Sequence, residues 1–203
     1  MISFIAKFAV VCVALSSLAT AFACASLDKA KPQEPAKPAA PAMPEFPAPE
    51  KEHTWLQQFV GEWTFDGDTV MGPDQPTIKN TGGESVRSLG GFWIVGEGKY
   101  EMMGQKMSSI ITLGYDPELK KYIGTWVDSM TSYMWHYIGT VDATGKILTL
   151  EAEGPNMNVP GKMAKFRDVI EFKSKNHRVL TSSMLGDDGK WFTFVTAQYR
   201  RKE

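Results

Sequence analysis

Cysteine is nearly absent from this sequence, and both copies lie close to its beginning. The 203 residues include two cysteines, Cys12 and Cys24. The rest of the chain therefore offers no thiol for a disulfide framework, a cysteine zinc site or a cysteine nucleophile. A surplus of charge is absent as well, because 22 Lys and Arg face 23 Asp and Glu. We expect no nucleic-acid partner, since binding to phosphates depends on a basic surface.

Recognisable catalytic signatures are also missing. The sequence holds no Gly-x-Ser-x-Gly elbow and no phosphate-binding glycine loop before a helix. Its three histidines, His53, His136 and His177, are far apart and have no metal-ligand spacing. We therefore expect no metal site, and a binding protein rather than an enzyme.

The first 23 residues have the pattern of a secretory signal peptide. Lys7 precedes a short apolar run and then a series of small residues. The apolar run is shorter than the roughly 20 residues that a membrane-spanning helix needs. Cleavage after Ala23 would leave Cys24 first, as in bacterial lipoproteins, whereas cleavage after Ala25 would remove Cys24. We expect an exported protein, which is periplasmic, anchored to a membrane by lipid on Cys24, or secreted.

Residues 24–50 form a proline- and alanine-rich segment. Between Lys31 and Glu50 the chain consists almost entirely of Pro, Ala, Lys and Glu. Proline stops both helix and sheet, and so little apolar surface cannot offset chain entropy. We interpret this segment as a disordered tether in front of a domain at residues 51–203.

The domain has the pattern of an all-β protein. A short helix is predicted over His53–Phe59, and about ten apolar runs separated by turn signals follow it. The predicted strands are Glu62–Asp66, Thr77–Leu89, Phe92–Glu101, Lys106–Tyr115, Lys121–Asp128, Ser132–Val141, Lys146–Glu153, Lys162–Phe172, Arg178–Leu185 and Trp191–Arg200. Short connections make neighbouring strands antiparallel, and closure into a barrel removes two exposed edges. The longer link at 154–161 is expected to be a flap at one mouth of this up-and-down barrel.

The motif Gly61-Glu62-Trp63, after a short helix, is the G-x-W signature of calycins. With Leu113–Asp116, Trp126–Ser129 and Tyr199-Arg200, the chain resembles a bacterial calycin-like (lipocalin-like) domain family of unknown function, often small and secreted. The resemblance implies a barrel with an interior and no assigned activity. It also implies that Trp63 plugs the barrel floor and that Arg200, or its neighbour Arg201, stacks on the indole.

Strand alternation assigns further residues to the interior. Over residues 164–172 it predicts an inward face of Ala164, Phe166, Asp168, Ile170 and Phe172. Trp126 and Asp128 share one face of their strand. A three-residue turn after Asp128 would put Met134 and His136 on that face too, whereas an odd register would oppose Trp126 to Trp135 and turn His136 away. The sequence leaves both registers open.

These positions give the candidate site and its alternatives. The leading hypothesis is a cell-envelope or secreted protein that holds a small apolar or amphipathic ligand among Trp126, Met134 and His136, with Asp128 and Asp168 as polar groups. Nine methionines in the domain suit such a pocket. The alternatives are a small enzyme that uses Asp128 and His136, and an envelope module with a filled barrel. No cofactor is expected apart from haem on His136, which some calycin relatives bind.

Overall fold

The computed structural model describes residue 43, residues 46–72 and residues 74–203. The expected signal peptide, its cleavage sites and the lipid site Cys24 lie outside the described residues, as does most of the expected tether. Among the described residues, no helix is both long and apolar enough to cross a membrane.

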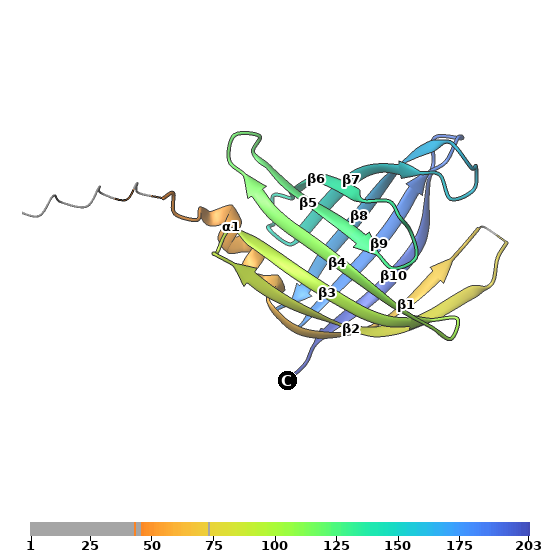
Figure 1. Cartoon of the computed structure of the whole chain (residues 1–203), viewed down its shortest axis with the longest axis horizontal. Helices are drawn as coiled ribbons and strands as arrows, with labels where there is room; N and C mark the ends of the chain where they lie inside the picture. The colour runs from red at the N-terminus through yellow and green to blue at the C-terminus, as the bar shows by residue number, and fades with distance from the viewer. Residues whose placement is uncertain (1–42, 44–45, 73) are drawn as a thin grey trace, which may run out of the picture. The chain divides into compact units, whose positions relative to one another are not determined.

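The described chain forms a short helix, a 3-10 turn and ten strands (Figure 1). The helix α1 spans Lys51–Leu56, and the turn η1 spans Gln57–Phe59. The strands are β1 Gly61–Val70, β2 Thr77–Leu89, β3 Trp93–Met102, β4 Gln105–Asp116, β5 Lys121–Asp128, β6 Trp135–Val141, β7 Ile147–Pro155, β8 Met163–Ser174, β9 His177–Leu185 and β10 Trp191–Arg201. The predicted helix at 53–59 is therefore an α-helix that begins at residue 51 and a 3-10 turn that follows it.

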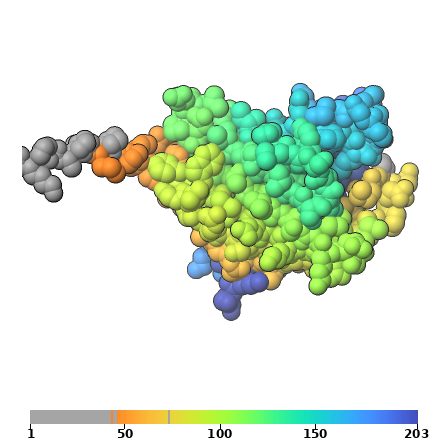
Figure 2. Space-filling model, in the orientation of Figure 1, coloured from red at the N-terminus to blue at the C-terminus, as the bar shows by residue number. Residues whose placement is uncertain are grey.

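Every strand pairs antiparallel with its neighbour in sequence, and β1 pairs with β10 to close the barrel. The closing seam aligns Trp63 with Arg201 and continues to Thr69 opposite Val195. This confirms the predicted ten-stranded up-and-down barrel. Closure leaves no unpaired strand edge, which explains how so many consecutive hairpins stay free of edge-to-edge association. Figure 2 shows one flank of this barrel, where the green side chains of β3 to β6 cover the surface.

Helix α1 lies at one end of the barrel (Figure 1). A hydrogen bond of the His53 ring connects it to strand β4. The Nδ1 atom of His53 accepts a hydrogen bond from the Glu50 amide at 2.9 Å. The neutral ring then carries its proton on Nε2, which donates to the Tyr115 carbonyl on β4 at 3.1 Å. The helix and the following turn thereby place Leu56 and Phe59, 0% and 2% exposed, into the end of the barrel.

The apolar core fills the half of the barrel next to α1. Strand alternation places the side chains as predicted on β8, where Phe166, Ile170 and Phe172 are buried. The core cluster consists of Leu56, Phe59, Trp63, Val86, Ile94, Leu113, Tyr122, Leu148, Leu150, Ile170 and Phe172. Because seven strands and the helical segment contribute to this cluster, burying it stabilises the closed barrel as a unit.

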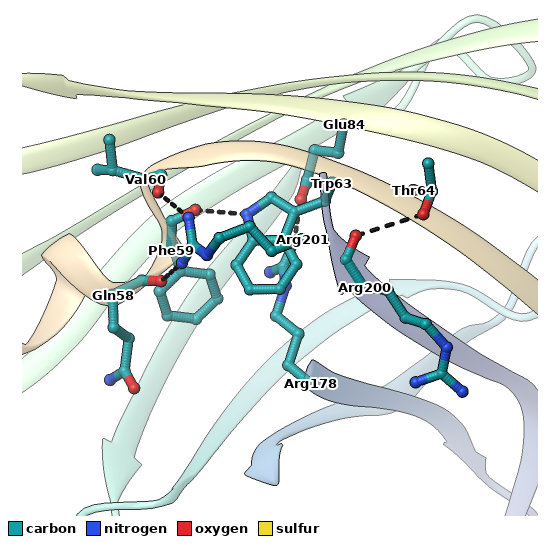
Figure 3. Close-up of polar contacts among 9 residues, drawn as sticks. All are labelled: Gln58, Phe59, Val60, Trp63, Thr64, Glu84, Arg178, Arg200 and Arg201. Atoms are coloured by element: carbon teal, nitrogen blue, oxygen red, sulfur yellow. Dashed lines mark hydrogen bonds and ion pairs between the residues drawn. The ribbon is translucent and has the colours of Figure 1, made fainter. Parts of the chain in front are cut away.

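Trp63 closes the barrel at this end. Its side chain is fully buried, and its Nε1 donates a hydrogen bond to the Phe59 carbonyl at 2.7 Å. The guanidinium carbons of Arg201 and Arg178 lie 4.2 Å and 4.7 Å from the indole centroid (Figure 3). The structure therefore has the tryptophan plug that the calycin resemblance implies, with two cations on the indole.

Arg200, the first choice for the stacking cation, is in the wrong register for that role. It pairs with Thr64 on the outer face and is exposed, and its carbonyl accepts a hydrogen bond from the Thr64 hydroxyl at 3.3 Å. Arg201 pairs with Trp63 and takes the inward position instead. A shift of one residue along a strand turns a side chain to the opposite face, so the alternative that named Arg201 is correct.

The glycine of the G-x-W motif makes room for Arg201. Gly61 has a φ of 130°, which side chains rarely adopt. A Cβ at this position would collide with the Arg201 guanidinium. That guanidinium donates hydrogen bonds to the carbonyls of Gln58 at 2.8 Å, Lys175 at 3.2 Å and Val60. The motif therefore joins the turn before β1 to the last strand.

Replacing Arg201 by alanine should destabilise the protein far more than replacing Arg200. The Arg201→Ala variant loses the contact with Trp63 and leaves three carbonyls without their donor. We expect a loss of about 2 kcal/mol in the free energy of unfolding. The Arg200→Ala variant should stay within about 0.5 kcal/mol of the native protein, as is usual for an exposed surface change. Urea denaturation measures both, and equal losses would contradict the assignment.

Candidate functional site

The interior of the barrel differs between its two ends. Next to α1 most inward side chains are buried in the core cluster, whereas toward the other end buried side chains such as Phe166 and Met184 lie among others that remain partly exposed to water. We call this second region the mouth half. Its half-buried inward side chains are Phe65, Tyr100, Met107, Ser109, Trp126, Asp128, Trp135, Tyr137, Asp168 and Tyr199. These side chains point into the closed barrel and remain partly exposed.

The register of β5 and β6 determines which predicted residues line the mouth half. Trp126 pairs with Trp135, and Thr125 pairs with His136. The connecting segment, residues 129–134, is longer than the three-residue turn that would have aligned Trp126 with Met134. Trp126, Asp128 and Trp135 therefore face inward together, as the odd register predicts.

His136 and Met134 do not belong to the interior. His136 is exposed on the outer face of β6, and Met134 lies in the loop before it with 48% of its surface exposed. The register that would have put His136 beside Asp128 inside the barrel is therefore not the one found, and the acid–base pair of the enzyme hypothesis does not form. A haem inside the barrel has no axial ligand in His136 for the same reason. Among the described residues, no three His, Asp or Glu side chains gather as a metal site.

Asp168 faces inward from β8, as predicted, and is held by a tyrosine. The Tyr137 hydroxyl donates a hydrogen bond to its Oδ2 at 2.5 Å, and Ser182 lies opposite it on β9. Burial raises the pKa of the Asp168 carboxyl above its ordinary value, while hydrogen bonds from the Ser182 and Tyr137 hydroxyls oppose that rise. Burial also raises the pKa of Tyr137, and the Asp168 carboxylate adds to the effect.

A buried ion pair lies beside Trp63 at the barrel floor. Arg178 on β9 forms an ion pair with Glu84 on β2, and their side chains are 6% and 13% exposed. The Arg178 guanidinium carbon also lies 4.3 Å from the ring centroid of Tyr199 and 4.9 Å from that of Phe59. This pair was not found in the sequence. The available signal was the position of Glu84 two residues before the inward Val86, since alternate residues share a face.

Two further tyrosines border the mouth half beside carboxylates. Burial and then Asp128 raise the pKa of Tyr100 to about 12. Burial raises the pKa of Tyr199 as well, with Glu84 adding to the rise and Arg178 opposing it. Both phenols are therefore neutral hydrogen-bonding groups at neutral pH. The ring of Phe65 lies between them, 4.9 Å from Tyr199 and 6.0 Å from Tyr100.

Methionines surround the open end. In Figure 1 the loops after β1, β3, β5 and β7 lie at the end of the barrel away from α1. In these loops, or at the strand end beside them, the exposed methionines are Met71, Met103, Met130, Met134, Met157 and Met163, each more than 40% exposed. Met102, Met107 and Met184 point inward below them. The flexible thioether adapts to varied apolar surfaces, so this rim suits the entry of an apolar molecule.

The expected flap at residues 154–161 lies at this rim and is held by hydrogen bonds. The Asn156 side chain accepts hydrogen bonds from the amides of Asn158 and Val159 at 2.8 Å and 3.0 Å. The Asn156 amide donates to the Lys162 carbonyl at 2.8 Å. A depression of about 280 Å³ beside the loop is lined by Glu153, Asn156, Met163, Ala164, Lys165, Leu185, Gly186 and Asp187. Its charged and open lining makes it a poorer site for an apolar molecule than the mouth half.

The fold and the residues around Trp63 place this protein in the class of calycin-like barrels. A family model for a protein of unknown function, DUF1579, matches residues 48–201, and the chain belongs to this family. The implied membership in a calycin-like family of unknown function is thereby confirmed. None of the curated proteins compared matches the chain.

Two solved structures share the fold at low sequence identity. Rv2717c from M. tuberculosis is 12% identical with a TM-score of 0.56, and the alignment covers 77% of this chain and 100% of that one. The S-type phycobiliprotein lyase CPES from Guillardia theta is 13% identical with a TM-score of 0.50, covering 74% and 92%. At this level of sequence identity the likeness shows a shared barrel fold alone.

The raised pKa values of the tyrosines predict a loss of stability at alkaline pH. Burial raises the pKa of Tyr100 and Tyr122 from 10.0 to about 12. Above pH 10 the unfolded chain releases these protons while the folded barrel retains them, so the free energy of unfolding falls as the pH rises from 10 toward 12. The tyrosinate absorbance and the circular dichroism should change together. Ionisation of most tyrosines near pH 10 in an intact barrel would contradict this.

Proposed function

We propose that this protein binds a small apolar or amphipathic molecule in the mouth half of the barrel. The observation that carries the proposal is a group of partly exposed aromatic side chains inside a closed barrel. The α1 end is filled by the core cluster, whereas the aromatic side chains of Phe65, Trp126 and Trp135 at the other end remain partly exposed to water. Concave, mostly apolar sites with a few polar groups are the usual form of a small-molecule site.

The polar groups of the mouth half give such a site its orientation. The Tyr137 hydroxyl holds the Asp168 carboxylate in place inside the barrel. Asp128 lies nearer the open end. A ligand would place its apolar body against the aromatic rings and its polar group against these oxygens. The likeness in fold to the phycobiliprotein lyase supports the use of a barrel interior and carries no further detail.

The N-terminal sequence supports a place for this binding activity in the cell envelope. Residues 1–23 have the signal-peptide pattern, and the proline-rich residues 24–50 follow them. We propose an exported protein, tethered through lipid on Cys24 or released after cleavage. The enzyme alternative loses its support, because His136 lies on the outer face of the barrel.

The proposal predicts that filling the mouth half abolishes uptake of an apolar probe. Ser109 points inward from β4 opposite Asp128, whereas its neighbour Ser108 is exposed on the outer face. N-phenyl-1-naphthylamine, a neutral dye that brightens in apolar surroundings, should bind to the native protein and to the Ser108→Trp variant. The Ser109→Trp variant should bind it at least about tenfold more weakly, since the added indole occupies the same space.

Fluorescence titration measures this uptake, and circular dichroism checks that both variants fold. A native barrel that takes up no dye would contradict the proposal. So would a Ser109→Trp variant that binds the dye as tightly as the Ser108→Trp variant, because the dye would then lie elsewhere on the protein. Native mass spectrometry of protein purified from its own host gives a second test, in which a bound small molecule is expected.

A further inference from the structure

The inward cations of this barrel are both engaged with groups of the protein. Among the described strand residues, Arg178 and Arg201 are the two cations at inward positions, as the strand register shows. Arg201 donates to three carbonyls at the barrel floor and lies against Trp63. Arg178 is paired with Glu84 and packed against Trp63 and Phe59 (Figure 3). It also packs against Tyr199. A ligand carboxylate would have to displace one of these contacts to find a cation.

The carboxylates of the mouth half are in the opposite situation. Asp168 and Asp128 both face inward, and neither lies within ion-pair distance of a described Lys, Arg or His. Asp168 receives the Tyr137 hydroxyl, and Oδ1 of Asp128 receives the amides of Met130 and Thr131. These are neutral donors, so the negative charge inside the barrel is not balanced. A carboxylate held away from bulk water is stabilised most by a cation.

Aromatic faces lie beside these carboxylates. Tyr100 and Trp126 face the interior at half-buried positions, and Tyr100 lies close enough to Asp128 for that carboxylate to add to the rise in its pKa that burial causes. The face of an aromatic ring attracts an organic cation, most strongly where water is excluded. The aromatic rings therefore favour a positively charged ligand, as the carboxylates do. The two groups do so through different interactions.

We infer that the ligand of the mouth half is an amphipathic organic cation whose ammonium or amidinium group lies against Asp168, with its apolar body along the aromatic side chains. This inference rests on the proposed function and specifies the class of ligand. It also excludes fatty acids as the preferred ligands. Tyr137 is a positioning residue here, since its hydroxyl fixes the orientation of the Asp168 carboxylate.

The experiment compares two ligands that differ only in the charged group. Dodecylamine and dodecanoate, each below its micelle concentration, compete with N-phenyl-1-naphthylamine for the full chain at neutral pH. Dodecylamine is expected to displace the dye at a concentration at least about tenfold lower, because a charge-assisted hydrogen bond forms with one ligand and like charges repel the other. Equal displacement, or stronger displacement by dodecanoate, overturns the inference.

Two variants test whether Asp168 causes the preference for a cationic ligand. In the Asp168→Asn variant the ratio of the two displacing concentrations should fall to about threefold or less, since the amide keeps the shape and removes the charge. Glu171→Gln, on the outer face of the same strand, should keep the native ratio and controls for a general effect of charge. An unchanged ratio in Asp168→Asn overturns the role of Asp168. If that variant fails to fold, the Asp128→Asn variant and the native comparison still decide the preference for a cation.

The two proposals fail in different ways. If the native protein takes up no dye, the proposed function fails and this inference fails with it. If the dye binds and both dodecyl compounds displace it equally, the binding function stands and the cation preference is wrong.

Discussion

The packing of one indole against two guanidinium groups holds this barrel closed. Trp63 lies fully buried where β1 meets β10, and Arg201 and Arg178 contact its ring. Arg201 also carries hydrogen bonds to the turn before β1, so the first and last strands and the helical segment meet at a single side chain. Because an up-and-down barrel has one closing seam, contacts at this seam stabilise the closed interior.

The floor also explains why the two halves of the interior differ. The helical segment and the core cluster fill the end next to Trp63, so stability comes from that half. The mouth half contributes less apolar burial and contains carboxylates and tyrosines that cost free energy when they are desolvated. These groups face an end of the barrel rimmed by methionines, which is where the proposed ligand would enter.

Local pattern was sufficient to predict the strands and the inward face of β8, because the two-residue period of a strand assigns faces directly. It was insufficient where a register depends on loop length. His136 and Arg200 were each one position from the inward residue, and nothing in the neighbouring sequence distinguishes the two faces. The Glu84–Arg178 pair joins residues 94 positions apart. Only closure of the barrel brings them together, so no local signal could reveal their contact.

The most direct test of this account is a crystal structure of the protein purified from its own host. The account predicts a bound organic molecule in the mouth half, in contact with Trp126 and Tyr100 and with a donor group on Asp168. It also predicts that the Glu84–Arg178 pair stays intact beneath the molecule. A mouth half closed by its own side chains, or a ligand carboxylate paired with Arg178, would contradict it.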